Sequence, residues 1–176
     1  MIHPDETAAH QKTTVETQFV YEDLCSRFEA AIGRLDAPAI RRMEATGAPW
    51  REIKATICAM AGESGLMQFA VFDQGAVASL AGSQICCRLY LVGNPVIASR
   101  IVRIDARGAL YVPFRVTVYA SPPGAGATIA FDRPSSLLAG LSQPELDEIG
   151  ALLDQEIDNA VLRAATLDVS VRETGA

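Results

Sequence analysis

The chain has 176 residues, a mass of 18.8 kDa and a net charge of −6 at neutral pH. This length favours one domain, with a core large enough to fold without a metal or a disulfide. Only two residues are lysines, Lys12 and Lys54. Nucleic acids and anionic membranes are bound by clustered positive charge, so we expect neither as a partner.

The amino-terminal segment 1–12 is polar and lacks the hydrophobic stretch of a secretory signal. No apolar run reaches the roughly 18 residues that a membrane-spanning helix needs. We therefore expect a cytoplasmic protein with reduced cysteines. We expect flexible tails at 1–12 and 168–176, on either side of a single domain that spans 13–167.

The first half of the chain mixes two kinds of hydrophobic spacing. Helical spacing of apolar residues occurs in 21–35, 39–46 and 49–61. Strand-like patterns occur in 13–20, 66–72 and 76–80, and the last two are separated by the turn signal Asp73-Gln74-Gly75.

A strand over 84–92 runs into Gly93-Asn94-Pro95, a sequence that suits a corner between a strand and a helix. Glycine permits a sharp bend, asparagine caps a helix, and proline fits the first helical position. The apolar residues after Pro95 recur at helical spacing, which predicts a helix that ends at Gly108.

The next segment, 110–119, alternates as a strand with one apolar and one amphipathic face. The apolar side is expected to face the core, and Arg115, Thr117 and Tyr119 lie on the other side. Pro113 cannot donate a hydrogen bond to a neighbouring strand, so we expect an edge or a bulge there.

The last part of the chain reads as a hairpin followed by a long helix. Residues 121–126 predict the hairpin loop, 128–131 its returning strand and 132–136 a structured loop. Ser142 and Glu145 match a capping box at the start of the helix. The whole order predicts an α+β fold, an antiparallel sheet with helices packed on one face.

Three short motifs in this order resemble the bacterial domain-of-unknown-function 302 family (DUF302). They are Gly93-Asn94-Pro95, Tyr111-x-Pro113-x-Arg115-Val116 and Asp132-x-Pro134-Ser135-Ser136. The resemblance covers about residues 15–166. It implies a fold like the TATA-binding protein's β-α-β4-α arrangement and a homodimer, and it implies no settled activity. Relatives often have Asp-His-Gly where this chain has Asp73-Gln74-Gly75, and Gln74 cannot titrate as a histidine does.

The two histidines, His3 and His10, fall in the expected tail, which leaves no histidine-based metal or catalytic cluster. Cys86 and Cys87 are adjacent in a strand, so their thiols point to opposite faces and suit small core residues better than a redox pair. We expect no metal and no cofactor.

A small polar pocket near the corner is the strongest candidate site. Its candidate ligand-binding residues are Asp73, Gln74, Asn94, Arg100, Tyr111, Arg115, Asp132, Ser135 and Ser136. The same residue types also suit plain capping and turn roles.

Three functions remain open from the sequence. The first is a homodimeric small-molecule-binding or accessory module with no assignable reaction. The second is an enzyme of unknown type that uses Asp73, Asp132 or Arg115 near the Gly93-Asn94-Pro95 corner. The third is a purely structural or protein-interaction dimer.

Overall fold

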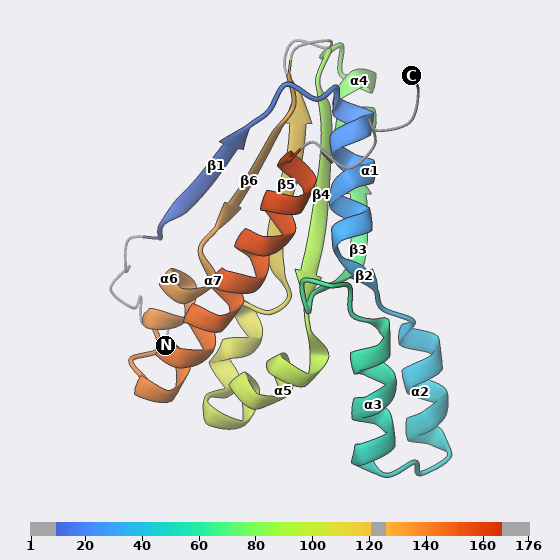
Figure 1. Ribbon diagram of the computed structural model, residues 1–176, viewed down its shortest axis with the longest axis vertical. Coiled ribbons are helices and arrows are strands. Elements are labelled where there is room, and N and C mark those ends of the chain that lie inside the picture. Colours follow the sequence, from blue (N-terminus) through green and yellow to red (C-terminus); the bar gives the residue numbers. More distant parts are fainter. Residues whose placement is uncertain (1–9, 121–125, 167–176) are drawn as a thin grey trace, which may run out of the picture.

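The computed structural model describes residues 10–120 and 126–166. Its centre is a six-stranded sheet in the order β1-β6-β5-β4-β3-β2 (Figure 1). The strands are β1 Lys12–Glu16, β2 Gly33–Arg34, β3 Met67–Asp73, β4 Cys86–Gly93, β5 Phe114–Ala120 and β6 Thr128–Asp132. Neighbouring strands are antiparallel except for β2 and β3, which are parallel. The α+β class is therefore confirmed, with a mixed sheet in place of the purely antiparallel one expected.

Two helices cover one face of this sheet: α1, Tyr21–Ala31, and α7, Pro144–Ala165 (Figure 1). Both are amphipathic, and their apolar stripes pack against the alternate residues of the strands. Phe28 of α1 meets Tyr90 of β4 edge to face, with ring centroids 5.3 Å apart. On β5, the expected core side is buried at Phe114, Val116 and Val118. Apolar burial of this kind is the main stabilising term of the fold.

A helical hairpin, α2 Ala37–Ala45 and α3 Trp50–Met60, extends beyond the end of the sheet (Figure 1). It has a small core of its own, in which Ile53 and Ile57 pack with Met67 at the start of β3. The expectation that the helices pack on one face of the sheet therefore holds for α1 and α7, and not for this hairpin.

The same end of the sheet carries three more short elements: α5 Pro95–Ile104, the 3-10 helix η1 Ala106–Leu110 and α6 Pro134–Ala139. The expected corner is present, because Asn94 Oδ1 accepts from the backbone N–H of Val96 at 2.9 Å. Residues 134–136, expected in a loop, instead begin α6, since a proline at the first position permits a helix.

The expected strand at 76–80 is wrong, because these residues belong to α4, Gln74–Leu80. Asp73 ends β3 and caps the helix: its Oδ1 accepts from the N–H of Ala76 at 2.8 Å. A short apolar run has no decisive period, so the turn signal was in fact a helix start.

Two further predictions, those for Pro113 and Ser142, are also wrong. Pro113 lies just before β5, which is an interior strand between β4 and β6, and it is neither at an edge nor in a bulge. Ser142 does not cap α7, because it has a positive φ of 54° and the N-cap position is Gln143, whose side chain makes no capping bond.

The pairing of β5 with β6 confirms the expected hairpin, while residues 121–125 of its loop lie outside the described part. Within 10–120 and 126–166, no helix combines the length and the hydrophobicity needed to cross a membrane.

Candidate functional site

The face of the sheet opposite α1 and α7 carries the more exposed side chains of β1 and β5. We call it the open face. Across it, the strand register sets Leu89 of β4 beside Thr117 of β5, Thr117 beside Ala130 of β6, and Ala130 beside Thr14 of β1. The next row contains Leu91 and Arg115, then Asp132 and Lys12.

A hollow of about 380 Å³ lies on this open face. The residues that line it are Lys12, Thr14, Leu89, Arg115, Thr117, Tyr119, Ala130, Phe131 and Asp132. They come from β1, β4, β5 and β6, strands separated by up to 120 positions in the chain. The volume is within the range of small-molecule sites, roughly 300–1,000 Å³.

A smaller hollow of about 90 Å³ adjoins it, and Arg115 and Asp132 line both. Its lining residues are His10, Leu110, Tyr111, Pro113, Phe114, Arg115, Asp132 and Leu137. Three sequence candidates, Tyr111, Arg115 and Asp132, are therefore brought together. His10, which the sequence assigned to a tail, joins them.

Arg115 and Asp132 make no hydrogen bond or ion pair among the described residues. Thr117, in contrast, already uses its hydroxyl: Oγ1 donates to the carbonyl of Arg88 at 3.3 Å. The charged groups of the hollow, Lys12, Arg115 and Asp132, thus lie on one row of the sheet.

The remaining sequence candidates have structural partners or lie elsewhere. Asn94 caps α5, and its Nδ2 donates to the carbonyl of Gly65 at 2.9 Å. Ser135 ties α6 to α7, since its hydroxyl donates to Asp154 at 2.7 Å. Ser136 accepts from the N–H of Gln11 at 3.0 Å and so holds the chain that enters β1.

Gln74 and Arg100 are exposed on α4 and α5 and line neither hollow. Asp73 lies opposite Arg88, at the other end of the sheet from the Arg115 row. From the strand spacing, Asp73 and Arg115 are roughly 14 Å apart, too far to share one reacting group.

Among the described residues, two carboxyl groups have shifted pKa values, and neither lines these hollows. Arg107 donates to Asp105 and lowers the pKa of that carboxyl. Burial raises the pKa of Glu156, on α7, to about 7. Within the described residues no group of three or more His, Cys, Asp and Glu side chains could hold a metal ion.

A polar cluster between α1 and β4 was not predicted from the sequence. The Tyr90 hydroxyl donates to Glu29 at 2.8 Å, and Arg88 forms an ion pair with Glu22 at 3.1 Å. The fully buried Cys25 also belongs here, and burial raises the pKa of its thiol and of the Tyr90 hydroxyl. A buried protonated thiol is a poor nucleophile, so we assign the cluster a structural role. The alternation of Arg88 and Tyr90 in one strand was the available signal.

Cys86 and Cys87 are free and point to opposite sides of β4, as expected. Cys86 packs against the helix-covered core, while the Cys87 thiol lies 3.5 Å from the Thr117 hydroxyl on the open face.

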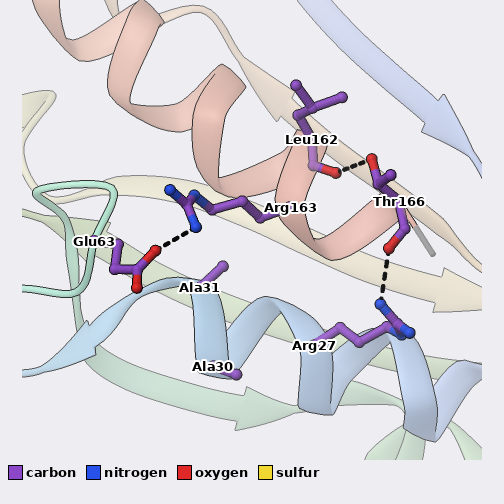
Figure 2. A pocket seen from close by; sticks show the side chains of 7 residues that line it. All are labelled: Arg27, Ala30, Ala31, Glu63, Leu162, Arg163 and Thr166. Atoms are coloured by element: carbon purple, nitrogen blue, oxygen red, sulfur yellow. Dashed lines mark hydrogen bonds and ion pairs between the residues drawn. The ribbon is translucent and has the colours of Figure 1, made fainter. Parts of the chain in front are cut away.

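A larger hollow, of about 680 Å³, lies between α1 and α7 (Figure 2). Its charged side chains already have partners. Arg163 forms an ion pair with Glu63, and Arg27 donates to the carbonyl of Thr166 at 2.9 Å. Since Ala30 and Ala31 form the rest of its α1 side, few groups remain to recognise a ligand.

The family model for the domain of unknown function DUF302 matches residues 42–164. The chain belongs to the DUF302 family. Its structure is similar to the crystal structure of an uncharacterised conserved DUF302 protein from Bacillus stearothermophilus, with a TM-score of 0.62 and 15% identity. That match covers 87% of this chain and 97% of the other, and at this identity it supports the fold alone. No curated protein matches this chain.

The DUF302 motifs named from the sequence meet at one end of the sheet, where β4 ends and β5 begins. Gly93 lies against Pro113, since a Cβ built on Gly93 would be 3.5 Å from Pro113 Cα. Tyr111, Arg115 and Asp132 then surround the smaller hollow. The motifs are thus one spatial unit, although nearly 40 residues separate Gly93 from Asp132 in the chain.

Proposed function

We propose that this DUF302 protein is a small-molecule-binding module without a reaction of its own, and that the hollow on the open face is its ligand site. The observation that carries the proposal is the convergence of four strands on a hollow of about 380 Å³. Its walls combine apolar surface from Leu89 and Ala130 with polar groups from Arg115 and Tyr119. A mostly apolar concavity with a few converging polar groups is typical of ligand sites.

The hollow supports binding better than it supports catalysis. A catalytic site normally contains a nucleophile, acid or base whose pKa is adapted to its task. The two carboxyl groups with shifted pKa values, Asp105 and Glu156, lie outside both hollows of the open face. The enzyme alternative therefore has less support.

Native mass spectrometry of protein purified gently from its own host tests this function. We expect a discrete small-molecule mass that denaturation releases. Tyr119→Ala, which removes one wall of the hollow, should lose this mass. Trp50→Ala is the matched control, because Trp50 is an exposed aromatic residue on α3, away from the open face. A wild-type protein without any bound mass, or a mass that survives Tyr119→Ala, would contradict the proposal.

We also propose that the protein is a homodimer that associates through α4. Leu80 and Val77 on this helix are 90% and 68% exposed, and residues 74–87 contain no charged side chain. Two copies of a chain with a net charge of −6 repel each other least when they meet through a neutral surface. An exposed apolar helix of this kind is a self-complementary surface for a symmetric dimer.

Leu80→Asp tests the dimer, with Leu110→Asp as its control. Leu110 is 79% exposed on η1, so its substitution places the same charge on a similarly exposed site. We expect wild type and Leu110→Asp to elute as dimers and Leu80→Asp as a monomer, measured by light scattering after size exclusion. A monomeric wild type would contradict the proposed homodimer. A dimeric Leu80→Asp would show that α4 is not the interface.

A further inference from the structure

We infer that the ligand of the open-face hollow is a small organic acid, whose carboxylate is held by Arg115 and Lys12; this inference rests on the proposed binding function. One row of the sheet carries three charged side chains. Lys12 of β1 lies opposite Asp132 of β6. Arg115 precedes Val116, which pairs with Phe131, so Arg115 extends the row on β5, and it lines the hollow together with Asp132. Two cations therefore flank one carboxylate at the edge of the hollow.

The cations of this row, Arg115 and Lys12, form no ion pair within the part of the chain that the structure describes. Arg133 and Arg88, in contrast, have acidic partners: Arg133 contacts Asp158 at 2.7 Å, and Arg88 contacts Glu22 at 3.1 Å. In a protein with 21 acidic residues, a pair of free cations at a concave site favours an anion.

The guanidinium group of Arg115 indicates which class of anionic ligand the hollow would bind. The guanidinium of arginine offers two parallel N–H groups that match both oxygens of a carboxylate. Lys12 adds a point charge on the far side of Asp132. Asp132 offsets one of the two cations and leaves the row a net charge of +1, so a single carboxylate fits it better than a polyanion does.

The other walls describe the rest of the ligand. Leu89 and Ala130 form an apolar floor beside the Tyr119 ring. Thr117 adds little polarity, because its hydroxyl is already bonded to the Arg88 carbonyl. A compact apolar or aromatic body is therefore expected next to the carboxylate, within a volume of about 380 Å³.

The experiment compares benzoate with benzamide, which share a ring and differ in charge, and adds inorganic phosphate as a third probe. Binding is followed by isothermal titration calorimetry at low salt. We expect benzoate to bind at least about tenfold more tightly than benzamide, because its carboxylate forms charge-assisted hydrogen bonds that the neutral amide cannot form. Phosphate, which lacks an apolar body, should also bind more weakly than benzoate.

Arg115→Gln should weaken benzoate binding by at least about tenfold for the same reason. Arg100→Gln is the matched control, because Arg100 is an exposed arginine on α5 that lines neither hollow of the open face. It should leave the affinity unchanged. Equal loss in both variants would show nonspecific attraction and overturn the inference.

The outcomes separate this inference from the function on which it rests. Equal affinities for benzamide and benzoate, or a higher affinity for phosphate, would contradict the inference that the ligand is an organic acid. Either result would still agree with the proposed binding function. A released native mass that proves to be a neutral compound would do the same. If no probe binds and no mass is released, both the inference and the proposed function fail.

Discussion

Alternate side chains of each strand point to the two faces of the sheet, and these faces differ in burial and polarity. On the face under α1 and α7, β5 presents Phe114, Val116 and Val118, all of them buried. On the open face, the same strand presents Arg115, Thr117 and Tyr119 around a hollow. The helix-covered face therefore carries most of the stability, while the open face is free to carry recognition.

Polar groups show the same division. Beneath α1, Tyr90 and Arg88 are bonded to Glu29 and Glu22, as partly buried polar groups need to be. On the open face, Arg115 and Asp132 have no such partners among the described residues. Unused polar groups at a concave surface are easier to explain by an external ligand than by folding.

The largest expected effect comes from the helix-covered face. Phe28→Ala removes a fully buried ring from contact with Tyr90, and we expect it to cost about 3–5 kcal/mol of folding free energy. Leu89→Ala, on the half-buried open face, should cost about 1 kcal/mol or less. Urea denaturation measures both. Equal losses of folding free energy in the two variants would contradict the claim that the helix-covered face carries most of the stability.

A pH-dependent effect is expected at Glu156, in the helix layer. Burial raises its pKa in the folded protein from 4.5 to about 7, so the folded state retains a proton that the unfolded state releases. The contribution of Glu156 to stability should therefore be fully present below pH 4.5 and be lost as the pH rises through about 7.

Glu156→Gln cannot titrate and should lack this fall. We expect equal stability of the two proteins at pH 4. At pH 8 the variant should be more stable by about 1–2 kcal/mol, a value reduced from the full shift because the side chain is partly exposed. Denaturant midpoints at the two pH values measure the difference. A constant difference between pH 4 and pH 8 would argue against a buried carboxyl.

A tyrosine on each face gives a finer comparison. Tyr90→Phe loses the hydrogen bond to Glu29 and should cost about 1 kcal/mol. Tyr119→Phe, on the open face, should change the stability by less than about 0.5 kcal/mol. Thermal unfolding of both variants beside wild type checks this. A larger cost at Tyr119 would mean that its hydroxyl has a structural partner.

The smallest effect is expected at the proposed ligand site. Arg115→Gln removes an exposed charge without an ion-pair partner among the described residues, so stability should change by less than about 0.5 kcal/mol. Arg133→Gln is the comparison, since it breaks the ion pair with Asp158 and a contact over the Phe131 ring. Denaturant titration should rank Arg133→Gln as the more damaging of the two.

Several elements of the fold could be predicted from the sequence, because they depend on residues close together in the chain. The Gly93-Asn94-Pro95 corner, the α5 stripe and the alternation within β5 were predicted correctly, because caps and periodicity depend on neighbours in the chain. The predicted helix end at Gly108 and strand start at 110 were wrong, since α5 ends at Ile104 and Ala106–Leu110 form η1. The same local rules failed for the short apolar run of α4 and for Ser142, where two local structures compete and the surroundings select one.

Only the tertiary structure decided which residues meet. Strand order and register bring Lys12, Arg115 and Asp132 into one row, and they add His10 to the hollow beside Tyr111. Pairing between distant strands depends on the whole core, so no spacing within the sequence reveals it. The sequence alone thus named Tyr111, Arg115 and Asp132 among its nine candidates, and the packing of the sheet placed them beside residues that the sequence had not singled out.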